Sequence, residues 1–169
     1  MTYAWMPAGA LPSQRDLEAR MDAPRWALQP PPAPSGNRLD TWTWRLQQTA
    51  DLTTSRADLQ SKAVSAGVPP GDIEDAVERL LLAYEELASN GLRHGQTPVS
   101  AEVTAAQDGW LIDVIDSAVD HGPIPDVDRD PAHGGLGLYL ISRLCGAYGW
   151  SVAAGRKHVW GYVQVATLS

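Results

Sequence analysis

The sequence predicts an α+β fold, a two-layer sandwich in which helices cover one face of a mostly antiparallel sheet. In residues 73–94, apolar side chains recur about every 3.6 positions, as on the buried side of an amphipathic helix. Two β-rich segments, 99–106 and 110–115, are joined by Gln107-Asp108-Gly109, which is typical of a hairpin. The order strand, helix, helix, two strands, loop, helix, two strands then leaves the helices to one face of the sheet.

The predicted domain begins with a strand and a shorter helix. Residues 41–46 alternate and are rich in β-forming types, which predicts a strand. Asp51 or Thr53 can cap a helix that runs to about residue 66. The residues expected on its inward side are Leu52, Leu59, Ala63 and Val64. Residues 67–71, rich in Gly and Pro, break this helix, and Asp72 is expected to cap the main helix that follows.

The remaining elements follow the central hairpin. Residues 117–133 predict a polar loop with three prolines. Residues 136–147 predict a helix that ends at Gly149. Residues 151–154 and 158–167 predict a closing hairpin around Gly155-Arg156-Lys157.

Residues 1–36 differ in composition from the rest of the chain. They hold seven of the thirteen prolines, so they lack N–H donors and favour extended structure. We interpret them as an arm or linker, in which Trp5 and Trp26 could dock on another surface. Residues 37–169 are then the folded domain.

Composition excludes several classes of protein. The net charge of −7 argues against direct nucleic-acid binding, which usually needs a basic patch. The single cysteine, Cys145, excludes an intrachain disulfide and a multi-cysteine metal site. No signal peptide is visible, and no apolar run approaches the ~20 residues of a membrane span. We expect a cytoplasmic protein that does not engage a membrane.

The most informative segment is Glu86-Leu-Ala-Ser-Asn90, near the end of the main helix. Residues four apart project from one side of a helix, here beside the apolar stripe. A carboxamide oxygen such as that of Asn90 can bind Mg²⁺, and a nearby carboxylate can take a proton from a hydroxyl. The alternative for this pair is a solvated helix face with a local hydrogen bond. Arg93 and His94 close the helix and could complement its negative end.

Two further features lie downstream. Asp116 ends an apolar strand, where an acid can accept a hydrogen bond from an exocyclic amine such as adenine N6; the alternative is an acid that caps a turn. Gly134, Gly135 and Gly137 open the last helix, where glycines and free N–H groups can hold phosphate; the alternative is an ordinary tight loop. Lys157 could reach a phosphate, although a turn lysine is more often solvated.

These residues resemble motifs of the GHKL ATPase superfamily, most of all its anti-sigma-factor serine/threonine kinase branch. The segment from Glu86 to His94 resembles the N box, Asp116 the acid that opens the first glycine box, and Gly134-Gly-Leu-Gly-Leu138 the second glycine box. The likeness covers roughly residues 40–168.

The resemblance implies a role for each matching position. Glu86 would be the general base, Asn90 would hold Mg²⁺ and Asp116 would bind adenine. His94 would lie near the lid and the phosphates. The residues implied to hold the ATP phosphates, with the neighbouring helix residue, are Gly134, Gly135, Leu136, Gly137 and Leu138.

One position departs from the family pattern. The usual Asp-x-Gly-x-Gly is Asp116-Ser-Ala118-Val-Asp120 here, with no glycine until Gly122. The Cβ of Ala118 is expected to narrow the nucleotide pocket or to re-route the loop.

The leading hypothesis is an ATP- and Mg²⁺-binding regulatory protein. It would bind a sigma factor or similar regulator and phosphorylate a small antagonist protein, and the resemblance makes a homodimer plausible through the first strand or the arm. A second hypothesis is a non-catalytic interaction module that binds nucleotide weakly. A third is the catalytic half of a split histidine kinase.

Overall fold

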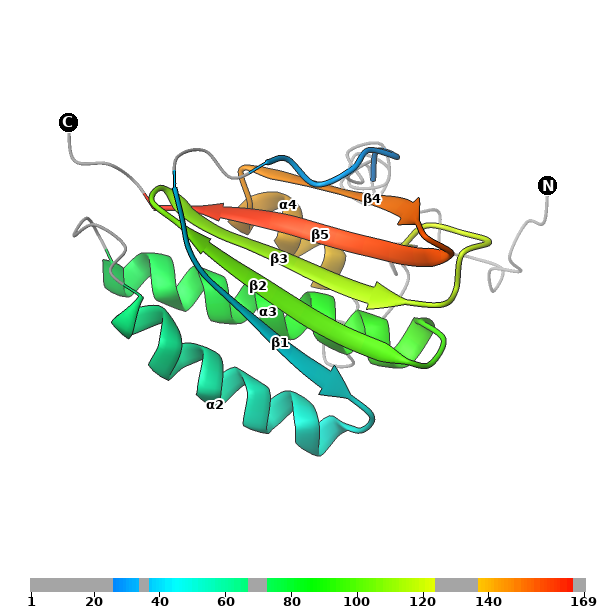
Figure 1. Ribbon diagram of the computed structural model, residues 1–169, viewed down its shortest axis with the longest axis horizontal. Coiled ribbons are helices and arrows are strands. Elements are labelled where there is room, and N and C mark those ends of the chain that lie inside the picture. The colour runs from blue at the N-terminus through cyan, green and yellow to red at the C-terminus, as the bar shows by residue number, and fades with distance from the viewer. Residues whose placement is uncertain (1–25, 34–36, 67–72, 124–136, 166–169) are drawn as a thin grey trace, which may run out of the picture.

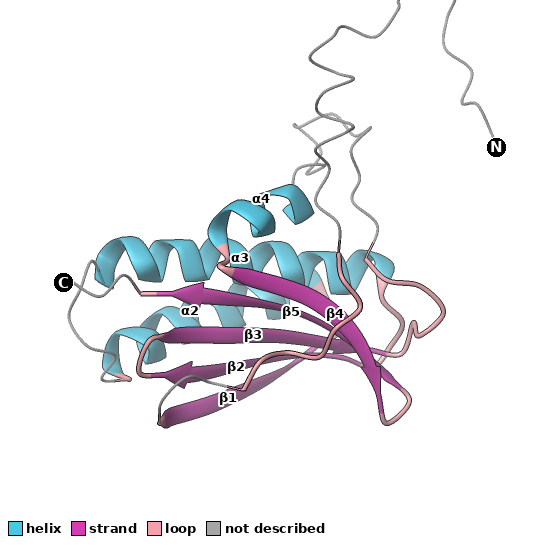
Figure 2. Ribbon diagram, turned by 90° about the horizontal axis from the view of Figure 1, so that it is seen from above, coloured by secondary structure: helices cyan, strands magenta, loops and turns pink. Residues whose placement is uncertain are grey.

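The computed structural model describes residues 26–33, 37–66, 73–123 and 137–165. Five strands form one sheet in the order β1-β2-β3-β5-β4, and every neighbouring pair is antiparallel. The three helices of the described residues lie together on one face of this sheet (Figures 1 and 2). The predicted fold class and element order are therefore confirmed. The elements are β1 Arg38–Leu46, α2 Thr49–Ser65, α3 Ile73–His94, β2 Val99–Ala106, β3 Gly109–Asp116, α4 Gly137–Leu144, β4 Ala147–Ala153 and β5 Arg156–Gln164.

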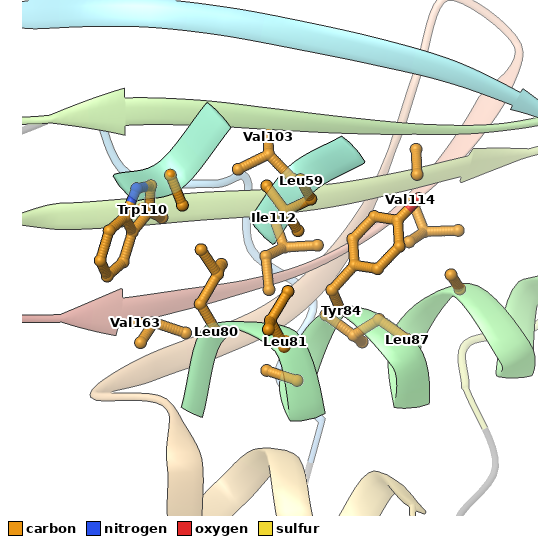
Figure 3. Packing of buried hydrophobic residues seen from close by; sticks show 14 of the residues in the cluster. Leu59, Leu80, Leu81, Tyr84, Leu87, Val103, Trp110, Ile112, Val114 and Val163 are labelled. Atoms are coloured by element: carbon orange, nitrogen blue, oxygen red, sulfur yellow. The ribbon is translucent and has the colours of Figure 1, made fainter. Parts of the chain in front are cut away.

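The core lies between α3 and the central strands (Figure 3). Alternate residues of β3 and β5 point to the helices, because successive side chains of a strand face opposite sides of the sheet. Tyr84 of α3 is fully buried, and its hydroxyl donates a hydrogen bond of 2.7 Å to Ser55 Oγ of α2. Burial raises the pKa of Tyr84 to about 12, so this donor keeps its proton at neutral pH. The fully buried side chains around it include Leu59, Leu80, Leu87, Val103, Trp110, Ile112, Val114 and Val163.

The first helix starts two residues before the predicted cap. The Asp51 carboxylate accepts hydrogen bonds from the backbone N–H of Gln47 at 2.8 Å and of Gln48 at 3.0 Å, so Asp51 caps the helix from within its first turn. Val64 is 70% exposed, and its predicted inward position is wrong. The buried stripe runs through Leu52, Ser55, Leu59 and Ala63, and Val64 falls beside it. The predicted break at 67–71 and the Asp72 cap lie outside the described residues.

The last helix is shorter than predicted. It ends at Leu144, and residues 147–153 pair with β5 instead. Gly149 is therefore not a helix stop but a residue of β4. A Cβ at Gly149 would lie 2.9 Å from the Trp160 ring and 3.0 Å from the Ala27 carbonyl oxygen, so the glycine makes room for a close approach of the chain. The final turn lies at Ala154-Gly155, both with positive φ, as two-residue hairpins require.

The end of the predicted arm packs against the sheet. Residues 26–33 lie beside β4 (Figure 1, blue), where Leu28 forms a parallel bridge with Trp150. Gln29 N donates to Trp150 O at 2.8 Å, and Trp160 Nε1 donates to Gln29 O at 2.9 Å. The ring of Trp26 meets that of Tyr148 edge to face, so Trp26 docks on the domain itself. Trp5 lies outside the described residues. Among the described helices, none is long and apolar enough to cross a membrane.

Candidate functional site

The last three turns of α3 carry the predicted polar pair. Glu86 and Asn90 are half-buried, whereas Leu87, Ala88 and Gly91 between and beside them are fully buried. The two side chains therefore project from the margin of the core, as the helical spacing predicted. A margin position suits a site, because a side chain there is held by packing on one flank and is still accessible to a ligand on the other.

Glu86 packs directly against the first residue of α4. A Cβ on Gly137 would collide with Glu86 Oε2 and would lie 3.2 Å from the carboxyl carbon. A residue without a side chain thus lets the start of α4 approach the carboxylate. The structure brings together one predicted glycine of the phosphate loop and the predicted general base, although they are far apart in the sequence.

The surroundings of Glu86 favour its protonated form. Burial is the largest cause that raises its pKa, the neighbouring Glu85 raises it further, and Arg93 opposes both. A raised carboxyl pKa brings the group closer to the operating pH, where it accepts and returns a proton most effectively.

Asp116, the last residue of β3, lies beside the C-terminal end of α3. Its carboxylate is almost completely buried, and Oδ1 accepts hydrogen bonds from Ala118 N at 2.6 Å and Gln96 N at 3.5 Å. A Cβ on Gly95 would lie 2.8 Å from the Asp116 carboxyl carbon, so the backbone just after α3 packs closely against this acid. Asp116 therefore caps the turn after β3, with the backbone N–H of Ala118 as a donor.

Lys157 overturns the sequence-based expectation of a solvated turn residue. It lies in β5 opposite Asp116, is 3% exposed, and its Nζ is 3.5 Å from Asp116 Oδ2. The prediction was wrong because the turn sits at 154–155 rather than at 155–157, which puts Lys157 inside the strand. The alternation Lys157, Val159, Gly161, Val163 was the available signal for a helix-facing position.

A comparison with protein-family models found a match over residues 47–160 to the histidine kinase-like ATPase domain. The chain belongs to this family. The predicted membership of the GHKL superfamily is thereby confirmed, although the match does not distinguish the branches within the superfamily. A search of the curated proteins found no match to the chain.

A histidine kinase-like ATPase domain implies nucleotide binding, generally with Mg²⁺, and the residues present here fit such a ligand. The contact with Gly137 occurs at Glu86 of α3, and the contact with Asp116 occurs at Gly95, the residue that follows α3. The two contacts are nine residues apart along α3 and the residue that follows it, which corresponds to about 13 Å along the helix axis. An extended nucleotide has a comparable length from base to terminal phosphate, so the spacing of the two contacts fits one ligand along α3, although Asp116 is almost completely buried.

The other predicted residues of the ATPase domain are less informative. Leu138 is buried, so its side chain belongs to the packing of α4. His94 is exposed at the last position of α3. Gly134, Gly135 and Leu136 lie outside the described residues.

The His158–Asp113 pair was not predicted and belongs to the opposite face of the sheet. His158 Nδ1 lies 2.8 Å from Asp113 Oδ2, between residues that alternate with the helix-facing ones of β3 and β5. Its strand position puts it away from Glu86 and Asn90, so the pair is not part of the candidate site.

Proposed function

We propose that this ATPase-family chain is a regulatory protein kinase. It binds ATP with Mg²⁺ and phosphorylates a serine or threonine of a small antagonist protein, and it binds a sigma factor or similar regulator. The observation that carries the catalytic part is the contact between the Glu86 carboxylate and Gly137 at the start of α4. This contact sets a half-buried acid of raised pKa beside the loop that resembles a phosphate-binding glycine box.

Glu86 has the position and chemistry of a general base. Its carboxylate would accept the proton that a substrate hydroxyl loses and would hold that hydroxyl in line for attack. When bound, ATP supplies the phosphoryl group and Mg²⁺ offsets its negative charge. The backbone N–H groups of the first turn of α4 have no partner within the helix, so they are donors that a phosphate beside Glu86 could use.

Asn90 is the proposed Mg²⁺ ligand, one turn beyond Glu86. Among the residues that the structure describes, no group of three or more His, Cys, Asp or Glu side chains could hold a metal ion. Mg²⁺ accepts few protein ligands and completes its shell with phosphate oxygens and water. A single carboxamide oxygen from Asn90 therefore suffices for the proposed arrangement.

The protein partners rest on the resemblance and on surface character. The net charge of −7 favours protein partners over nucleic acid. β1 is an edge strand of the sheet, and most of its residues are exposed or half-buried, which supports its use as a dimer contact.

A matched pair of glutamate variants tests the catalytic proposal. In Glu86→Gln the base is lost, so we expect ATP affinity by calorimetry to stay within about threefold while phosphoryl transfer falls by about 10²–10⁴-fold. The control is Glu78→Gln, because Glu78 is an exposed glutamate of the same helix and lies about two turns before Glu86. The purified protein and γ-labelled ATP are added to an extract of the source organism. Phosphoryl transfer is then measured as the acid-stable label on the proteins of that extract.

The outcomes separate the alternatives. Equal transfer by Glu86→Gln and the wild type would remove Glu86 from the role of base. Acid-labile label would indicate transfer to histidine instead.

A non-catalytic interaction module is the second candidate. The burial of Asp116 and its hydrogen bond from Ala118 favour it, because part of the expected adenine acceptor is already engaged. The absence of ATP binding at millimolar nucleotide would support this candidate over the kinase.

A further inference from the structure

A buried ion pair lies where β3 ends and β5 begins. The Asp116 and Lys157 side chains face each other in strand register and are 2% and 4% exposed, with 3.5 Å between Oδ2 and Nζ. Charged side chains are rarely buried so completely unless paired. A buried ion pair adds little stability over well-packed apolar residues, because both ions lose their hydration. Stability of the fold alone does not explain why the two residues are present.

The Lys157 ammonium has fewer hydrogen-bond partners than the Asp116 carboxylate. Asp116 already accepts hydrogen bonds from two backbone N–H groups through Oδ1, and its Oδ2 faces Lys157. A lysine ammonium has three N–H donors. Within the described part of the chain, Asp116 Oδ2 is the acceptor found near Nζ. A ligand atom that accepts a hydrogen bond would therefore satisfy the ammonium, while Oδ2 keeps a lone pair for a ligand donor.

We propose that Lys157 is a specificity-determining residue of the nucleotide site, an inference that rests on the proposed function. The Lys157 ammonium donates a hydrogen bond to ring nitrogen N1 of adenine, and Asp116 Oδ2 accepts one from the neighbouring N6 amine. N1 and N6 are adjacent on one edge of the base, so an adjacent donor and acceptor match them. Because the two side chains are 2% and 4% exposed, the base reaches them only if the groups that cover the pair move aside.

The first test changes the ligand and leaves the protein intact. In 1-deaza-ATP a C–H group replaces N1, so the molecule keeps the N6 amine but cannot accept a bond from Lys157. We expect wild-type protein to bind 1-deaza-ATP about tenfold more weakly than ATP, as measured by calorimetry with Mg²⁺. Equal affinities for ATP and 1-deaza-ATP would overturn the proposal.

The second test removes the donor from the protein. Lys157→Met keeps an apolar stem of similar length, and we expect it to bind ATP about tenfold more weakly and no longer to distinguish ATP from 1-deaza-ATP. Purine riboside triphosphate, which lacks N6, should still bind more weakly than ATP to this variant, because Asp116 remains. The control is Lys62→Met, since Lys62 is an exposed lysine of α2. Urea unfolding checks that each variant is folded.

The results separate this inference from the proposed function. No binding of ATP by wild-type protein would contradict both. Binding of ATP together with equal binding of 1-deaza-ATP would contradict the role of Lys157 and leave the function standing. Tighter ATP binding by Lys157→Met would show that the ammonium competes with the base, and it would also overturn the proposal.

Discussion

At the scale of single residues, Glu85 and Glu86 show how one helix gives adjacent acids different chemistry. Glu85 is exposed and pairs with Arg56 of α2, whereas Glu86 is half-buried beside Gly137. The difference follows from helix geometry, because consecutive residues point about 100° apart. Burial raises the pKa of Glu86, and its contact with Gly137 of α4 is part of that burial, while the neighbouring Glu85 raises the pKa further.

His158 gives a residue-scale prediction of pH-dependent stability. Its hydrogen bond to Asp113 raises its pKa above 6.5, with opposing contributions from burial and Arg156 and a supporting one from Glu102. The folded state then binds the proton more tightly than the unfolded state does. The stabilisation is therefore complete below about pH 6.5 and is lost as pH rises through the folded-state pKa.

Urea unfolding of wild type and His158→Gln measures this effect. We expect the variant to be less stable by about 1 kcal/mol near pH 6, and the difference to shrink toward pH 9. His94→Gln is the control, because His94 is exposed at the end of α3. A difference that stays constant between the two pH values would rule out the protonated pair as its source.

At the scale of elements, the approach of α4 to α3 sets the geometry of the site. Gly137 begins α4, and its missing side chain leaves space for the Glu86 carboxylate. Gly91 plays a different part in α3, because a Cβ there would lie 2.7 Å from Val114 Cγ1 in the core. Gly137 thus makes room for the flexible carboxylate of Glu86, and Gly91 makes room for the packed side chain of Val114.

Alanine at these two glycines should separate function from stability. In Gly137→Ala the carboxylate of Glu86 can swing away, so we expect transfer activity to fall at least tenfold while the unfolding free energy changes by less than about 1 kcal/mol. In Gly91→Ala the core is overpacked, so we expect a loss of about 1–3 kcal/mol. Phosphoryl transfer and urea unfolding are measured on both variants. A stability loss in Gly137→Ala as large as in Gly91→Ala would contradict this account.

The elements that the sequence predicted well are those with a local pattern. The apolar period was sufficient to predict α3, and the turn residues were sufficient to predict the hairpin of β2 and β3. Glu86 and Asn90 lie on α3 where the helical spacing put them. The end of α4 depended on the pairing of β4 with β5, a contact that no local pattern specifies. The burial of Lys157 could have been predicted from the alternation along β5, once the turn was placed at residues 154–155. A shift of one residue in such a pairing moves every side chain to the other face.

At the scale of the whole molecule, the sheet is enclosed from two directions. Helices cover one face, and residues 26–33 lie along the β4 edge, so that this edge strand is not left unpaired (Figure 2). The family match begins at residue 47, after β1, so this segment and β1 lie outside the matched domain. The segment is nevertheless held by backbone bonds to Trp150 and by the indole of Trp160.

Two truncated chains, beginning at Trp26 and at Pro34, isolate the contribution of that segment. The shorter chain loses the backbone bonds between residues 27–29 and Trp150, the bond from Trp160 and the ring contact of Trp26 with Tyr148. At about 1 kcal/mol for each hydrogen bond, with apolar burial added, we expect it to be about 2–4 kcal/mol less stable in urea than the chain that begins at Trp26. Its tryptophan emission should shift to the red, because Trp160, 1% exposed in the full chain, loses its cover. Equal stability and unshifted emission would mean that β4 keeps its position without residues 26–33. The segment would then contact the sheet without stabilising the fold.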